Sequence, residues 1–215
     1  MPPILLVGTM IEAACHVSCK LQETCDPRKL DLQTIQSAFE VYTEIDRTSF
    51  RDYDTSEENP IWGSFRKWKG QVAVYALPEI MVEIRYARHL RNKEDWLRLI
   101  ITKELCHSLD AEEGQHNVSD RNLVDLVNKF SFHSNLESSG TIDGLLKLEL
   151  LAEICALEIL CPFQFRREYV EKSGYPDAAT CRDLAIHFNI PQPYTNAIFS
   201  PSAMNAIGML MPINL

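Results

Sequence analysis

Apolar residues recur at helical spacing along most of this chain, which predicts a mainly helical fold. Proline, glycine and polar turn residues separate the periodic segments and predict helices over residues 9–23, 31–45, 92–110, 120–131, 142–160, 163–173 and 177–190. Apolar side chains cover most of the circumference of the helices over 92–110 and 142–160. We therefore expect these two helices to be buried at the centre of the fold.

Strand signals are confined to one short region. Residues 70–77 and 80–87 are rich in β-branched and aromatic side chains and are joined by Pro78-Glu79, so they predict a hairpin. The polar stretches 46–66 and 111–120 predict connections with little regular structure. The sequence thus predicts an α+β fold, mainly helical, with a small antiparallel or mixed sheet before the helix over 92–110, for which Asn92 is the expected N-cap.

The length and composition predict one continuous domain with a well-formed core. The chain has 215 residues, of which 46% are hydrophobic. We divide it into an N-terminal helical segment with its connection (1–66), a central core (67–165) that contains an insertion at 111–141, and a C-terminal helical hairpin with a tail (166–215).

Charge and cysteine content narrow the class of protein. The net charge of −9, from 30 acidic and 21 basic residues, argues against a nucleic-acid-coating role on electrostatic grounds. The apolar N-terminal run lacks a basic region and is interrupted by Glu12, so it predicts neither a signal peptide nor a membrane helix. Seven cysteines, an odd number, favour reduced thiols. We therefore expect a cytoplasmic protein without a membrane partner.

Three polar residues stand out because they lie on the two most apolar helices. Glu104 and His107 belong to the stretch K-E-L-C-H, and Glu149 belongs to the helix over 142–160. A buried charge is unfavourable unless it is paired or bound to a metal, so we expect these side chains to be one another's partners. The stretch differs by one residue from H-E-x-x-H, in which two histidines bind zinc and the glutamate deprotonates a metal-bound water.

The helix over 142–160 carries a longer pattern. Residues 149–162 fit the motif E-x-x-A-x-x-F-A-x-x-L-L-x-P, with Cys155 in place of the aromatic residue and Ile159 in place of a leucine. After K-E-L-C-H, this pattern resembles the ImmA/IrrE family of zincin-like metallopeptidases. The opening helix, the small sheet and the C-terminal helical hairpin are also similar to that family, so the resemblance covers residues 30–200.

The resemblance implies a zincin-like core and a set of site residues. By position, Glu104 is the general base, and His107 and Glu149 are metal ligands, while Lys103 stands where the family has its first histidine ligand. Members of the family act in the regulation of phages and mobile elements and in stress responses. The resemblance therefore implies a regulatory role with a protein partner or a regulatory protein substrate.

Lys103 changes what the site is expected to do. Catalytic zinc takes three protein ligands, and a protonated lysine repels a divalent cation, so zinc should bind weakly or not at all. A lysine ligates a metal only as the neutral amine, which requires a large fall in its pKa. We expect Lys103 to act instead as an internal cation that pairs with Glu149 and also with Glu104, in a site that needs no cofactor.

Two functions from different classes remain open. The first is a degenerate zincin-like domain, a pseudoenzyme that regulates through protein–protein contacts. The alternative is an active zinc-dependent endopeptidase that cleaves a repressor-like protein, with His116 or Glu153 as the reserve ligand. DNA binding through a helix-turn-helix over residues 182–198 is disfavoured, because Arg182 is its one basic residue.

Several other polar residues are interpreted as structural. The pattern C-H-x-x-C-x5-C at residues 15–25 could hold a metal, but it is more typical of helix packing. Cys106 and His107 are neighbours on a helix and point about 100° apart, which argues against a catalytic Cys–His pair. We expect His116 to be exposed on a loop, and Glu153 and Glu158 to occupy solvated or rim positions. His133 and His187 show no partner pattern. For the apolar tail after Pro201 the sequence allows two alternatives: the tail packs on its own domain, or it forms an interface.

Overall fold

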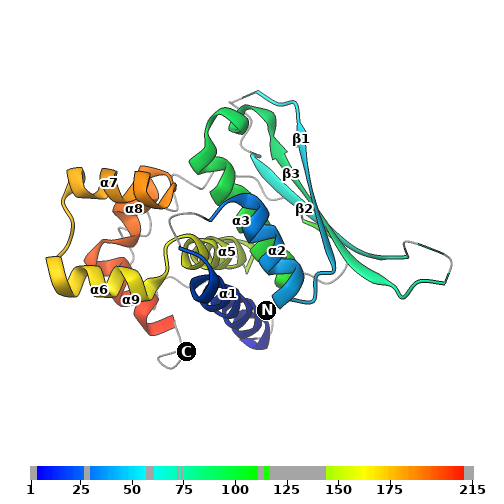
Figure 1. Ribbon diagram of the computed structural model, residues 1–215, viewed down its shortest axis with the longest axis horizontal. Coiled ribbons are helices and arrows are strands. Elements are labelled where there is room, and N and C mark those ends of the chain that lie inside the picture. The colour runs from blue at the N-terminus through cyan, green and yellow to red at the C-terminus, as the bar shows by residue number, and fades with distance from the viewer. Residues whose placement is uncertain are drawn as a thin grey trace.

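A computed structural model describes residues 4–26, 30–56, 61–71, 73, 75–110, 114–116 and 144–210. These residues form eight α-helices, one 3-10 helix and a four-stranded sheet, so the α+β class and the mainly helical content are confirmed. The sheet lies on one side of the central helices, and the helices of the C-terminal part lie on the other (Figure 1). None of the helices in the described part is long and apolar enough to cross a membrane.

The sheet combines parallel and antiparallel pairs. Its strands are β1 (Arg47–Tyr53), β2 (Gly63–Gly70), β3 (Glu79–Ala87) and β4 (Gly114–His116), in the order β1-β3-β2-β4. Strand β3 runs parallel to β1 and antiparallel to β2, and the short β4 pairs antiparallel with β2. Strands β1 to β3 precede the helix over 92–110, as predicted, whereas β4 follows it.

The predicted strand positions were partly wrong. The stretch 46–66, expected to be irregular, contains β1 and the start of β2, and the described part of 71–77 is the hairpin loop rather than a strand. Strand β1 lies at an edge of the sheet and keeps every second side chain exposed, so its polar residues hide the strand signal. The stretch 111–120, also expected to be irregular, contains β4.

Most of the predicted helices are present with shifted ends. They are α1 (Ile4–Thr24), α2 (Leu32–Tyr42), α3 (Glu94–Asp110), α5 (Gly144–Leu160), α6 (Phe163–Ser173) and α7 (Ala178–Phe188). Asn92 does not cap α3, because it ends the 3-10 helix η2 (Arg88–Asn92). Helix α8 (Gln192–Ile198) falls in the C-terminal helical hairpin that the resemblance implied, whereas α9 (Pro201–Leu210) was not predicted. The helix predicted over 120–131 lies outside the described residues.

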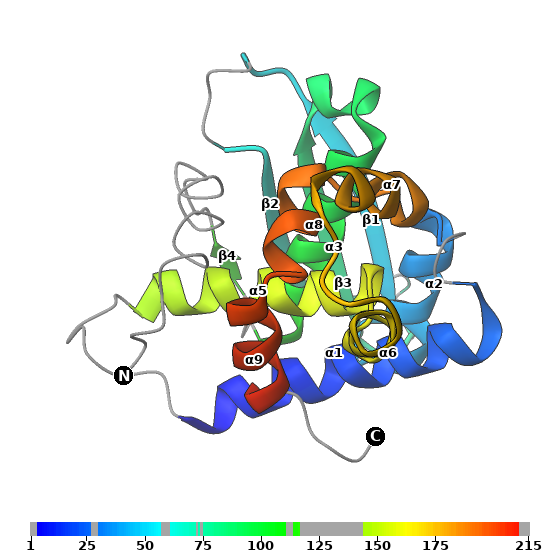
Figure 2. The same cartoon turned by 90° about the vertical axis from the view of Figure 1, so that its left-hand side faces the viewer.

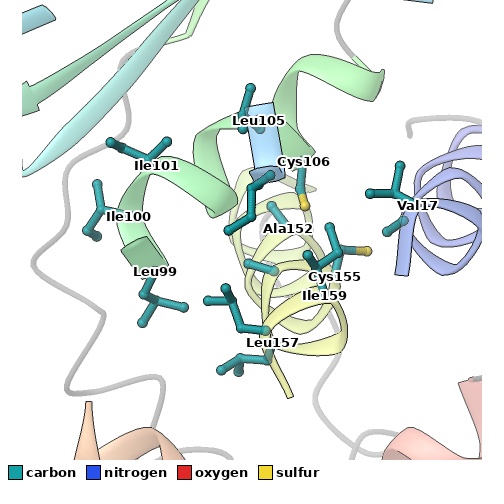
Figure 3. Packing of buried hydrophobic residues seen from close by; sticks show 14 of the residues in the cluster. Val17, Leu99, Ile100, Ile101, Leu105, Cys106, Ala152, Cys155, Leu157 and Ile159 are labelled. Carbon is teal, nitrogen blue, oxygen red and sulfur yellow. The ribbon is translucent and has the colours of Figure 1, made fainter. Parts of the chain in front are cut away.

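Helices α1, α3 and α5 form the centre of the hydrophobic core. Figure 3 shows apolar side chains of α3 and α5 facing each other, with Val17 of α1 alongside. Residues of α3 such as Leu99 and Leu105, and residues of α5 such as Ala152 and Leu160, are fully buried. The expected central position of the two most apolar helices is therefore confirmed.

Arg98 joins the C-terminal helices to this centre. Helices α6 to α9 are grouped on the face of α3 and α5 that is turned away from the sheet (Figure 2). Arg98 of α3 donates hydrogen bonds to the carbonyl oxygens of Phe188 and Asn189, at 2.7 and 2.8 Å, where α7 ends. Because these carbonyls have no acceptor role inside the helix, the buried guanidinium acts as a C-terminal cap supplied by another element.

Helix α2 covers part of the edge of β1. The Glu40 carboxylate accepts hydrogen bonds from Thr48 N and Thr48 Oγ1 at 2.6 and 2.7 Å, and Gln36 Nε2 donates to the Thr48 carbonyl at 3.1 Å. An edge strand presents unpaired backbone groups, and here two side chains of one helix satisfy those of Thr48.

Strand β2 packs on α3 at Gly63, where there is no room for a side chain. A Cβ atom at Gly63 would lie 2.6 Å from Ile100 Cγ2 and 2.8 Å from Glu104 Oε1. We expect Gly63→Ala to lower the free energy of unfolding by about 1–3 kcal/mol, because β2 must move off α3. Urea denaturation measures this loss. Gly70→Ala is the matched control, since its Cβ would meet only side-chain atoms of Met81 and Trp68 at 3.3 Å or more; equal losses in both variants would contradict the prediction.

Candidate functional site

The site is built where α3 faces α5. Lys103 and His107 are four residues apart, so they lie on one face of α3, and that face is turned toward Glu149 of α5. Lys103 Nζ lies 2.6 Å from Glu149 Oε2, and His107 Nε2 lies 2.9 Å from Glu149 Oε1. Each oxygen of this carboxylate thus has its own nitrogen partner from α3. The expected pairing of Lys103 with Glu149 is present.

All three side chains are shielded from water. The side chains of Lys103 and Glu149 are only 3% and 9% exposed, and that of His107 is largely buried. Lys103 is among the largest fully buried side chains of the described residues. An ammonium and a carboxylate are strongly disfavoured in such a place unless they are paired, so each charge requires the other.

The surroundings of Glu149 act on its pKa in opposite directions. Burial alone would raise the pKa of this carboxyl, but the polar contact with His107 and the positive charge of Lys103 outweigh burial and lower the pKa to about 2. Glu149 therefore carries its negative charge at neutral pH. The His107 nitrogen approaches it without a well-aligned hydrogen bond, so Lys103 makes the firmer contact.

Glu104 occupies the side of α3 that faces the sheet. It is buried, and its Oε1 lies against Gly63 of β2. Neighbouring residues on a helix point about 100° apart, which explains why Glu104 and Lys103 face different elements. The predicted general base is thus packed under β2.

Strand β2 also fixes the end of α3. The ring of His107 stacks on Phe65, with the centroids 6.0 Å apart and the planes nearly parallel. Lys67 Nζ donates a hydrogen bond of 2.9 Å to the Ser108 carbonyl in the last turn of α3. Phe65 and Lys67 were not foreseen as site neighbours, because the sequence predicted no strand at their positions. The local strand signal is weak there, because Arg66 and Lys67 interrupt the alternation of apolar and polar residues around Phe65.

Glu153 and Glu158 are buried, so their expected solvated or rim positions were wrong. The hydroxyl of Tyr194 on α8 donates a hydrogen bond to Glu153, whose carboxylate is thereby engaged with the C-terminal helices. Glu158 lies 3.2 Å from the buried guanidinium of Arg166 and accepts a hydrogen bond from Phe163 N at 2.8 Å. It therefore caps the start of α6, where no side chain of the N-cap residue Pro162 can do so.

Three of the other candidates whose side chains the structure describes, Cys15, His16 and His187, make their contacts elsewhere. Cys15 is buried in the core, and His16 makes an edge-to-face contact with Tyr42. All seven cysteines are free, and the four expected in the core, Cys106, Cys155, Cys161 and Cys181, are buried. His187 contacts Phe188 within α7. The backbone of His116 lies in β4 opposite Phe65, and its side chain lies outside the described part, as does all of His133.

The donor set around Glu149 does not fit a catalytic zinc ion. One imidazole and one carboxylate converge, but the third group is an ammonium, which has no lone pair and already contacts Glu149 at 2.6 Å. A dication beside it would be repelled, because both carry positive charge. Within the described ranges, no group of three or more His, Cys, Asp or Glu side chains is arranged to hold a metal.

Comparison with known proteins does not assign this chain to a family. No model of a protein family matches the chain, and no curated protein sequence matches it. The resemblance to ImmA/IrrE proteins therefore remains a prediction from the sequence motifs alone.

Removal of Lys103 should leave a buried, unpaired carboxylate. We expect Lys103→Met to lower the free energy of unfolding by about 3–5 kcal/mol, and the double variant Lys103→Met/Glu149→Leu to recover most of that loss. Urea denaturation of the two single variants and the double variant provides the cycle. As a control, Lys172→Met breaks an exposed pair with Glu168 and should cost less than about 1 kcal/mol. Additive losses from the two single variants would contradict a direct pairing.

The depressed pKa of Glu149 predicts how stability depends on pH. The folded-state pKa of about 2 lies below the ordinary value of 4.5, so the stabilisation is present above pH 4.5 and is lost as the pH falls toward 2. We expect the free energy of unfolding of the wild type to exceed that of Glu149→Gln by about 3 kcal/mol at neutral pH. This difference should shrink as the pH falls from 4.5 toward 2. Denaturation at several pH values measures it. Glu168→Gln, on the exposed face of α6, is the control. A difference between the wild type and Glu149→Gln that does not change with pH would refute the lowered pKa of Glu149.

Proposed function

We propose that this chain is a zincin-like regulatory domain that acts through protein contacts and holds an internal ion pair where a peptidase would hold its metal. The observation that carries the proposal is the buried contact between Lys103 and Glu149, with His107 on the second carboxylate oxygen. The K-E-L-C-H and E-L-L-A-E stretches supply these residues in the order that the ImmA/IrrE motifs would require.

The ion pair supports a structural role for residues that would otherwise be catalytic. A zinc peptidase needs an open coordination position where water becomes a nucleophile. Lys103 brings one positive charge to Glu149 from within the chain, so the carboxylate is satisfied without a ligand that could activate water. The same contact joins α3 to α5, and the site then stabilises the core instead of carrying out hydrolysis.

The alternative, an active zinc endopeptidase, has less support from the geometry. It would need Lys103 to give up its contact with Glu149 and another residue to complete the ligand set. Glu153, one reserve ligand, is engaged by Tyr194 of α8. Glu104, the general base in that mechanism, is packed against β2.

A regulatory domain of this kind would recognise a protein in the cytoplasm. The acidic net charge of −9 favours a protein partner over nucleic acid. The partner would then bind the surface of the domain, since the ion pair is inaccessible.

Restoring the histidine tests whether Lys103 replaces a metal. We expect Lys103→His to bind about one zinc per chain, because the introduced imidazole would complete a His/His/Glu ligand set with His107 and Glu149. Elemental analysis after dialysis against zinc measures this. The double variant Lys103→His/Glu149→Ala should lose the metal, and Lys172→His, on the exposed α6, should gain none.

Two results would count against the proposal. A folded Lys103→His protein without zinc would mean that the arrangement is not that of a zincin. Stoichiometric zinc in the wild type that disappears in Glu149→Ala would instead support the endopeptidase, with a ligand from outside the motif.

A further inference from the structure

The hairpin that joins β2 to β3 carries the two most exposed large apolar side chains of the described residues. Tyr75 is 99% exposed and Leu77 is 85% exposed. We define the hairpin tip as the described residues between these strands, Gln71, Ala73 and Tyr75–Pro78. Figure 1 shows the hairpin extending beyond the helices, away from the rest of the molecule. None of the described helices covers this tip in that view.

The chemistry of the tip favours contact with another surface. Residues 71–78 contain no charged side chain, and the segment is rich in β-branched and apolar residues. A contiguous stretch of exposed apolar residues without charge is typical of an interaction site, whereas single exposed apolar residues are not. The strands on both sides of the tip carry charged residues. An apolar contact at the tip would therefore have a polar rim, as protein interfaces have.

A groove that could receive the tip lies on the same chain, between α1 and α2. Its volume is about 360 Å³, and its apolar lining residues are Leu21, Ala38, Val41 and Tyr42. Val41 is 68% exposed at this groove, although it is an aliphatic residue on an otherwise well-packed helix. The hairpin tip points away from α1 and α2 in Figure 1, so a molecule's own tip does not fill its groove.

Charge also pairs the two surfaces. The hairpin over residues 63–85 carries four basic and two acidic residues, with Arg66 and Lys69 exposed on β2. The segment over residues 20–44, which forms the groove, carries five acidic and three basic residues. The Asp31 carboxylate lines the groove, and hydrogen bonds from Thr34 lower its pKa, so it is charged. Opposite charges of this kind guide two surfaces together and set their orientation.

From these observations we propose that the hairpin tip of one molecule docks in the α1–α2 groove of a second copy of the chain. One contact would cover Tyr75, Leu77 and Val41, which are three of the six exposed large apolar residues in the described part. The contact is smaller than a standard interface, so the association should be weak and concentration-dependent. It is independent of the buried ion pair, and its failure would leave the function proposed above untouched.

The oligomeric state in solution tests the proposal. We expect the weight-average mass in sedimentation equilibrium to rise above one chain between about 10 and 500 μM. A tip variant, Tyr75→Ser/Leu77→Ser, and a groove variant, Val41→Lys, should each weaken the association at least about tenfold, through lost apolar contact and like-charge repulsion respectively. Ile186→Ser is the control, since Ile186 is exposed on α7 and should leave the mass unchanged. Circular dichroism verifies that every variant is folded.

Mixing the two variants identifies the contact. The tip variant keeps an intact groove and the groove variant keeps an intact tip, so the mixture should form a one-to-one complex that neither forms alone. A wild type that stays monomeric throughout the range overturns the proposal. Self-association that persists in the groove variant overturns it as well, because the tips would then pair with each other. If the protein stays monomeric but floats with anionic vesicles, and the tip variant does not float with them, then the hairpin tip binds lipid instead of a second copy of the chain.

Discussion

The negative charge of Glu149 is the constraint around which the rest of the structure is arranged. It lies inside the core, where water cannot solvate it, so a cation must come from the protein. Lys103 and His107 supply two nitrogen atoms one helical turn apart, and they can do so only if α3 and α5 keep one relative position along their axes. A core of apolar side chains alone would tolerate several such positions, whereas the ion pair selects one.

The relative position of α3 and α5 also determines where the neighbouring elements pack. Strand β2 packs on the opposite side of α3 through Gly63 and stacks Phe65 on His107, so the sheet is placed relative to the ion pair. On the other side, Tyr194 of α8 contacts Glu153, which lies one turn beyond Glu149 on α5. Polar groups of α3 and α5 thus organise both the sheet and the C-terminal helices, while the apolar residues provide most of the driving force.

Part of the ion pair could be predicted from sequence because its helices are so apolar. A charge on such a helix needs a partner, which marked Glu149 and His107, whereas Lys103 was identified from its position in the K-E-L-C-H stretch. The burial of Glu153 and Glu158 was missed for different reasons. Tyr194 lies 41 residues from Glu153, on a helix without a strong periodic signal, and Arg166 was hidden in a segment that reads as a polar surface helix. Strand β1 was missed because an edge strand keeps polar residues on its exposed positions.

The contact between α2 and Thr48 restricts how the sheet can grow. Glu40 and Gln36 occupy the backbone N–H and carbonyl of Thr48 on the outer side of β1. An extended peptide that arrived along this edge would have to displace both side chains before it could form a regular ladder, and Glu40 would lose its hydrogen bonds in the process. The edge is therefore blocked to strand addition at Thr48 by a helix of the same domain, without a proline or a bulge in the strand itself.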